Sequence, residues 1–245
     1  MTTITEVAQL ASPFLRDYPD FVMEKREIFR TPVRHLVVGF SFGPPHYKGE
    51  VDLYWRVEFL FSPPNFSVGI GRQIDGAHGF LGEDPTLPAR VRAEMERAAS
   101  EVIVSGTSLD NMLSVQQHMN PYAGMSYPSQ ALLHAALGRF PEARAVLEKY
   151  LDLNWADANA YGASPSVVIG SKKSERRQRF KVQWLENLGN LDALRIMLAE
   201  EDPAPVAALL HEWEAMNVQV RKLERFWRPS PFPFESKVAS ANGPS

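Results

Sequence analysis

The chain has 245 residues, of which 44% are hydrophobic and 22% are charged, and these fractions are typical of a globular protein. They exclude disorder along the whole chain. The formal charge of −3 argues against a general nucleic-acid-binding protein, because such proteins usually carry a basic excess. The sequence has no cysteine, which excludes disulfides, thiolate nucleophiles and cysteine-ligated metal sites.

The sequence predicts neither export nor insertion into a membrane. Residues 1–6 lack the basic and apolar regions of a signal peptide. The longest apolar runs, such as Leu36–Phe40, are far shorter than the ~20 residues that are needed to cross a bilayer. We therefore expect a cytoplasmic protein without a membrane segment.

A helix is expected at the beginning of the chain. Thr3 and Glu6 have the spacing of a capping box, in which each side chain accepts a hydrogen bond from the other residue's backbone N–H. Apolar residues then recur on one helical stripe as far as Phe14. Pro19 should end this helix.

Four strands are expected to follow the helix. Apolar and polar side chains alternate strictly in residues 51–61, which is the clearest strand pattern of the sequence. Residues 33–42 and 66–72 predict two further strands, and residues 22–30 predict a weaker one. Because the connections are too short for crossover helices, the strands should pair as a four-stranded antiparallel meander.

We expect the chain to form two domains that a linker joins, followed by a tail. Residues 1–118 should form an α+β domain, in which helices cover the meander. Residues 119–128 (MNPYAGMSYP) combine proline, glycine and asparagine and predict a linker. Residues 129–228 should form an all-α domain of helical hairpins, whose last helix runs from Asp202–Pro203 to Pro229. Residues 229–245 should form a proline-rich, flexible tail.

Two turns of the second half resemble those of a tetratricopeptide repeat. Two segments are similar to the turn between the two helices of such a repeat. They are Leu137–Ala143 (LGRFPEA) and Leu188–Ala193 (LGNLDA). The resemblance covers residues ~126–227. The two copies begin 51 residues apart, whereas the repeat has a period of about 34. The resemblance implies helical hairpins with a turn at Gly138 and at Gly189, and it does not extend to the family's peptide-binding groove.

The first half, residues ~1–118, has a second resemblance, which is one of layout alone. A helix, a meander and covering helices are also the layout of small bacterial α+β domains. Some of those domains occur among immunity proteins for secreted toxins. The layout therefore implies a bacterial protein that acts by binding another protein.

One motif formally matches that of a serine hydrolase. Residues 39–43 (GFSFG) fit G-x-S-x-G, in which the serine lies on a turn from a strand into a helix. Pro44 and Pro45 follow at once and cannot open such a helix. Ser41 is therefore interpreted as a strand residue. The histidines also lack metal-ligand spacing, so no catalytic, metal-binding or cofactor-binding residue is assigned and no cofactor is expected.

The glycine-rich segment 69–82 is the first candidate site. Its five glycines predict a flexible loop between sheet and helix. Arg72, Asp75 and His78 are candidate ligand-binding residues, and His46 is a fourth. The alternative is a purely structural connection that Phe80 and Leu81 hold in place.

A basic segment is the second candidate site. Residues 171–181 (SKKSERRQRFK) contain six basic residues and one acidic residue at the start of a helix, with Phe180 on its inner face. Positive charge at a helix N-terminus opposes the helix dipole, which suggests an acidic partner, and the alternative is a solvated helix face. The candidate partner-binding residues are Lys172, Lys173, Arg176, Arg177 and Arg179.

Aromatic residues near the C-terminus are further candidates for partner binding. Trp227, Phe232 and Phe234 lie among prolines, which block helix and sheet, so an extended chain is expected. This segment could fold back over the sheet or dock into a partner.

Three functions stay open at this point. The first is a non-enzymatic, cytoplasmic protein-interaction or immunity-type protein whose partner is another protein. The second is a small-ligand-binding protein or a hydrolase-like enzyme that uses residues 69–82. The third is a nucleic-acid contact through residues 172–181, which the negative net charge disfavours. The sequence predicts no oligomeric state.

Overall fold

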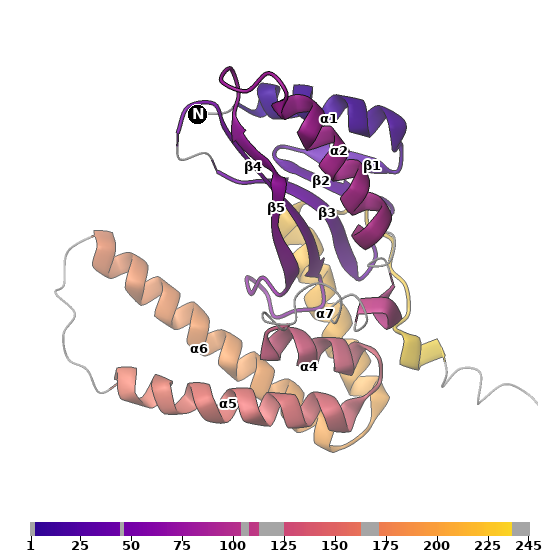
Figure 1. Ribbon diagram of the computed structural model, residues 1–245. Coiled ribbons are helices and arrows are strands. Elements are labelled where there is room, and N and C mark those ends of the chain that lie inside the picture. Colours follow the sequence, from indigo (N-terminus) through magenta and orange to yellow (C-terminus); the bar gives the residue numbers. More distant parts are fainter. Residues whose placement is uncertain (1–2, 45–46, 104–107, 113–124, 163–171, 237–245) are drawn as a thin grey trace, which may run out of the picture. The chain divides into compact units, whose positions relative to one another are not determined.

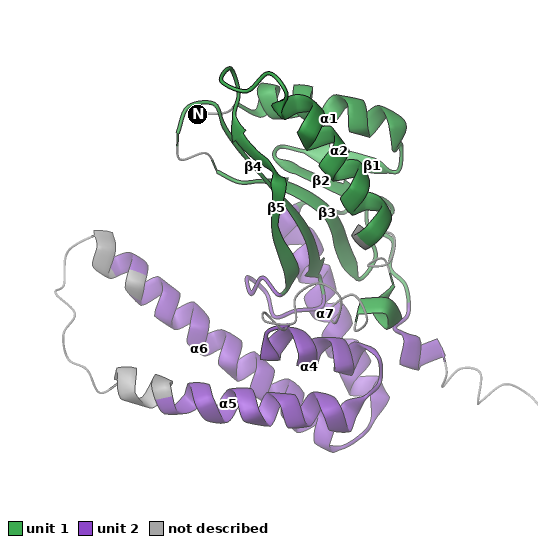
Figure 2. Cartoon of the chain, in the orientation of Figure 1, with its two compact units in different colours: residues 1–60, 69–124, 222–230 green, residues 61–68, 125–221, 231–245 purple. Residues whose placement is uncertain are grey.

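The computed structural model describes residues 3–44, 47–103, 108–112, 125–162 and 172–236 (Figure 1). The fold class is α+β, as expected, and the chain forms two compact units (Figure 2). Unit 1 contains residues 1–60, 69–124 and 222–230, and unit 2 contains residues 61–68, 125–221 and 231–245. The units are therefore interleaved along the sequence rather than consecutive.

Helix α1 (Ile4–Asp17) begins unit 1 and confirms the predicted capping box. The Thr3 N–H donates to the Glu6 carboxylate at 2.6 Å, and the Glu6 N–H donates to Thr3 Oγ1 at 3.2 Å. The bonds from Thr3 lower the pKa of Glu6. Phe14 is fully buried, and its ring packs edge-on against Phe40 of the sheet at 5.4 Å.

The sheet of unit 1 is an antiparallel meander of five strands, which are neighbours in chain order. The expected meander is confirmed, but it has five strands instead of four. Residues 22–30 form a hairpin rather than one strand, and the turn contains Lys25 with a positive φ of 56°. The strands are β1 (Phe21–Glu24), β2 (Glu27–Arg30), β3 (Leu36–Phe42), β4 (Glu50–Phe59) and β5 (Gly69–Phe80).

The inner face of the sheet carries the core of unit 1. The alternation that predicted β4 is confirmed, because every second residue of the strand from Val51 to Phe59 is buried. Trp55 lies opposite Phe40 of β3, so the two strands contribute to one apolar face. Helices α1 and α2 (Leu87–Ala98) cover this face (Figure 1), and α2 continues into the π-helical turn η1 (Ala99–Ile103).

The end of the predicted helical domain and the first residues of the predicted tail belong to unit 1. The Val33 N–H donates to the Phe226 carbonyl at 3.0 Å, and the Arg228 N–H donates to the Val33 carbonyl at 2.8 Å. The ring of Phe226 packs edge-on against Phe29 at 5.3 Å. Phe29 pairs with Gly39 rather than Phe40, so it lies on the sheet face opposite Phe40. Residues 222–230 thus fold back onto the sheet.

Unit 2 is helical, with a hairpin of α4 (Tyr127–Ala136) and α5 (Phe140–Gly162), followed by α6 (Lys172–Ala199) and α7 (Pro203–Arg221). The turn at Gly138 is as expected. The second expected turn is wrong, because α6 continues through Gly189 without a break. The last helix is also shorter than expected, since α7 ends at Arg221 and Lys222 has a positive φ of 59°.

Helices α5 and α6 form a long hairpin whose two arms diverge toward residues 162 and 172 (Figure 1). Close to the α4 end, Leu147 and Leu151 of α5 and Leu188 and Leu191 of α6 are buried. Toward the diverging ends, burial falls, and large apolar side chains are exposed. The hairpin therefore has a packed base and two open arms.

Candidate functional site

The glycine-rich segment is a strand and not a loop. Residues 69–80 form β5, which pairs with β4 over most of its length. Arg72 lies opposite Trp55 and His78 lies opposite Asp52, so the two side chains belong to opposite faces of the sheet. The side chains of Arg72 and Asp75 make no hydrogen bond or ion pair with another described residue, and His46 lies outside the described residues. The expected convergence of these four residues on one ligand is therefore not what the described part of the chain shows.

The structure instead brings together Asp52, Gln73 and His78. The Gln73 amide donates to Asp52 Oδ1 at 2.8 Å, and His78 Nδ1 lies 2.5 Å from the same oxygen. Asp52 is nearly covered, with 12% of its side chain exposed, whereas His78 is 48% exposed. One carboxylate oxygen thus fixes an amide and an imidazole.

An irregularity of the sheet creates this cluster. Gln73 and His78 are five residues apart, and regular alternation would place them on opposite faces. The pairing shifts between Asp52 and Tyr54, so that four residues of β5 (74–77) face one residue of β4. Such bulges change the direction of side chains. Here the bulge directs Gln73 and His78 to the same carboxylate.

The chemistry of the cluster is that of one oriented imidazole. When Nδ1 carries the proton, it donates a hydrogen bond to Asp52, and Nε2 is left as a hydrogen-bond acceptor. Ser41 does not complete a triad, because it lies within β3 opposite Tyr54 and its hydroxyl makes no hydrogen bond to a described residue. A Cβ atom at Gly39 would overlap the Ile28 carbonyl oxygen, so the glycine of the GFSFG motif reflects close strands rather than a catalytic turn.

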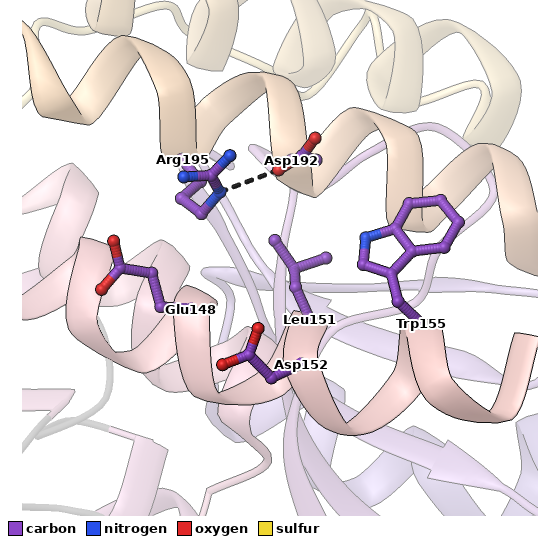
Figure 3. Close-up of a pocket in the computed structure, with 6 residues that line it drawn as sticks. All are labelled: Glu148, Leu151, Asp152, Trp155, Asp192 and Arg195. Atoms are coloured by element: carbon purple, nitrogen blue, oxygen red, sulfur yellow. Dashed lines mark hydrogen bonds and ion pairs between the residues drawn. The ribbon is translucent and has the colours of Figure 1, made fainter.

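A pocket of about 540 Å³ lies between α5 and α6 (Figure 3). Arg195 donates to Asp192 on its own helix at 2.8 Å rather than across to α5. Glu148 accepts from Arg144 at 2.8 Å, whereas Asp152 has no hydrogen bond or ion pair with a described residue. The lining residues are Glu148, Leu151, Asp152, Trp155, Asp192 and Arg195.

Two apolar stripes continue from this pocket along the open arms. On α5 the buried Leu147 and Leu151 are followed, one turn later, by Trp155, which is 36% exposed. On α6 the buried Leu188 is preceded by Trp184, which is half-buried, and by Phe180, which is 75% exposed. Each helix thus carries an apolar stripe that is longer than its packed part. The expectation that Phe180 faces a core is wrong.

The basic segment forms the beginning of α6. Arg176 and Arg179 are exposed, and the nearest partner of Arg179 is Glu175 at 3.9 Å. The side chains of Lys172, Lys173 and Arg177 lie outside the described residues. Charges at this end of α6 are therefore accessible wherever they are described.

The C-terminal aromatic residues pack against other parts of this chain and do not form an exposed surface. Phe232 is fully buried and Phe234 is 6% exposed, and Trp227 is half-buried in its bridge with Val33. In unit 2, Phe232 packs edge-on against Phe61 at 5.6 Å. The expected flexible tail is therefore ordered as far as residue 236, and residues 237–245 lie outside the described residues.

Comparisons with protein-family models, with curated proteins and with solved structures gave no match. Within the described ranges, no helix combines the length and the apolar character that crossing a membrane requires. In the same ranges, no three His, Asp or Glu side chains gather closely enough to hold a metal ion.

Of the open arms, the basic beginning of α6 was expected as a site from the sequence, but the two apolar stripes were not. Their signal was present, because Leu147, Leu151 and Trp155 follow helical spacing, as do Phe180, Trp184 and Leu188. Such spacing predicts that one face of the helix is buried, but it does not show how far along the helix this face is covered by other elements. The Asp52 cluster had no signal, since it depends on a bulge that spacing does not show.

Proposed function

We propose that this chain is a non-enzymatic protein-interaction protein, and that the open arms of α5 and α6 bind its partner. The observation that supports this is the exposure of Phe180 and Trp155 on stripes that are buried further along the same helices. Large exposed apolar side chains that are rimmed by polar ones mark interaction surfaces. An immunity function would be one case of such an interaction.

The chemistry of the arms suits a protein better than a small molecule. Trp155 and Phe180 offer aromatic area at low cost in side-chain entropy, as anchors of protein interfaces do. The rim is charged, with the carboxylate of Asp152, which has no hydrogen bond or ion pair with a described residue, at the pocket and with Arg176 and Arg179 near the beginning of α6. A groove between two helices is a common place for a helix of another protein.

Site-specific crosslinking tests this proposal. A photoreactive residue is placed at Trp155, at Phe180 or at Ile196, which is 52% exposed near the other end of α6 and serves as the matched control. We expect the same protein to be captured from positions 155 and 180, and not from 196. Capture from all three positions, or from none, would contradict the proposal.

Binding of the captured protein, once purified, provides the quantitative step. Phe180→Ser and Trp155→Ala should each raise its Kd at least tenfold, because aromatic anchors carry most of an interface's energy. Ile196→Ser should leave the Kd within about twofold. Circular dichroism of each variant checks that α6 is still helical.

A further inference from the structure

The open arms carry their charges in a definite order. At the packed base the pocket presents Glu148 and Asp152, and of these Asp152 is uncompensated among the described residues. The apolar side chains of Trp155, Trp184 and Phe180 follow along the arms. Toward the beginning of α6, Arg176 and Arg179 are exposed and basic. The order is therefore acidic, apolar, basic.

This order is complementary to itself. A two-fold rotation about an axis through the apolar middle exchanges the two ends of the surface, as in an isologous dimer. The basic end of one copy then faces the acidic pocket of the other, and the reverse contact forms by symmetry. Along α6, 13 residues separate Arg179 from Asp192, which is about 20 Å at 1.5 Å per residue. The two charged ends of the surface are therefore far enough apart to make separate contacts.

We propose that the partner of the open arms is a second copy of this chain, bound antiparallel along the α5–α6 hairpin. The inference rests on the proposed function, since it specifies which protein the arms bind. Phe180 and Trp155 of each copy form the centre of the interface. Arg176 and Arg179 of one copy face Glu148 and Asp152 of the other, and these contacts set the direction of pairing.

Charge reversal in complementary pairs tests the arrangement. Variant A carries Glu148→Lys and Asp152→Lys, and variant B carries Arg176→Glu and Arg179→Glu. The control variant carries Glu200→Lys and Glu212→Lys, two exposed positions outside the proposed interface. Molar mass is measured by light scattering and sedimentation, with each protein alone and with A and B mixed.

We expect the unchanged chain and the control to dimerise, more weakly in high salt because the rim charges are screened. Variants A and B alone should each dimerise at least tenfold more weakly, because like charges then meet at both contacts. The mixture should recover a dimer of one A and one B, since both contacts are again attractive. Recovery would not occur if the reversals had merely damaged the fold.

Two results would overturn this inference. One is an unchanged chain that stays monomeric at about 100 µM in low salt, and the other is an A and B mixture that stays as weak as either variant alone. Either result leaves the proposed function intact, because crosslinks from positions 155 and 180 to a different protein would still support it. If the arms capture neither a second copy nor another protein, the proposed function fails as well.

Discussion

Gly138 and Gly189 show how one local sequence takes two structures. Both follow a leucine and precede similar residues, and both resemble the turn glycine of a helical repeat. Gly138 has a φ of +74°, and a Cβ atom there would lie 2.6 Å from the Cβ of Phe234. Gly189 lies within α6 and has no atom within 4 Å of such a Cβ. Phe234, the residue that crowds Gly138, comes 96 residues later in the sequence.

The two glycines should therefore respond oppositely to alanine. Gly138→Ala is expected to lower the free energy of unfolding by at least about 1 kcal/mol, because an L-residue is strained at this φ and its Cβ meets Phe234. Gly189→Ala should raise it by about 0.5–1 kcal/mol, since alanine is the better helix former. Urea denaturation of the two variants and the unchanged chain measures both effects. Destabilisation by both substitutions would argue for a turn at Gly189.

His134 should make stability depend on pH. Burial and the nearby Arg139 lower the pKa of His134 from its ordinary value of 6.5, and its Nδ1 is buried without a hydrogen bond to a described residue. Below about pH 6.5 the unfolded chain therefore takes up a proton that the folded chain resists. The free energy of unfolding should fall as the pH drops through this range and level off above it.

The variant His134→Gln isolates this contribution. As the pH falls below 6.5, the free energy of unfolding of the variant should rise relative to that of the unchanged chain, because the variant has no imidazole to protonate. Above that pH the difference should be constant. Denaturation at a series of pH values measures it, and a difference that does not vary with pH would refute the burial of the imidazole.

Asp52 should fix the tautomer of His78. Because Asp52 accepts from Nδ1, the neutral imidazole is expected to carry its proton there, and ring nitrogen shifts in an NMR spectrum report this directly. Asp52→Asn should shift the population toward a mixture, and Gln73→Ala should do so less. Equal tautomer populations in the unchanged chain would show that the pair is not formed in solution.

At the scale of elements, the segment Pro231–Glu235 acts as a strap across unit 2. His211 Nε2 of α7 lies 2.9 Å from Glu235 Oε2, which also accepts from the Phe232 N–H at 2.7 Å. The His211 ring lies 4.6 Å from that of Phe232. The strap is therefore held by a buried ring and by a polar clasp at its end.

Two phenylalanines provide a matched test of the strap. Phe232 is fully buried and Phe180 is 75% exposed. Phe232→Ala should cost about 3–5 kcal/mol of unfolding free energy, as the loss of a buried ring does. Phe180→Ala, measured at a concentration at which the chain is monomeric, should stay within about 0.5 kcal/mol, as surface substitutions do. Similar costs for both, measured by urea denaturation, would mean that the strap is not docked.

The elements that could be predicted from sequence are those whose cause is local. The capping box at Thr3 and the alternation in β4 depend on neighbouring residues, and both are confirmed. The beginning of β5 was expected as a strand, as far as residue 72, but the rest of it was expected as a loop because its glycines suggested flexibility. A Cβ atom at Gly69 would overlap the Val57 carbonyl, so glycine is needed there for close pairing with β4. The pairing partner, and not the local composition, decides the structure.

At the scale of the whole molecule, the sequence predicted two kinds of architecture but not how the chain is shared between them. The α+β half and the helical half are both present. Residues 61–68 nevertheless belong to unit 2, and residues 222–230 belong to unit 1. Within unit 2 the Asn217 amide donates to the Ser62 carbonyl at 2.8 Å, across 155 residues. No local pattern contains such a partner.

Fragments cut at the expected linker should therefore be unstable. A fragment ending at residue 124 lacks Phe226 and Arg228, which bond to Val33, and a fragment beginning at residue 125 lacks Phe61, which packs on Phe232. Each fragment expressed alone should lose its cooperative thermal transition. The two expressed together should recover part of it. A fully cooperative transition of either fragment alone would contradict the interleaved division.

The interleaving also bears on how the protein is made. A ribosome releases residues in order, and most multidomain chains complete their first domain while the rest is still being translated. Here residues 222–230, which pair with Val33 of the sheet unit, are translated after helices α4, α5, α6 and α7 of unit 2. The backbone N–H and carbonyl of Val33 must therefore stay without these partners until residues 222–230 have been translated.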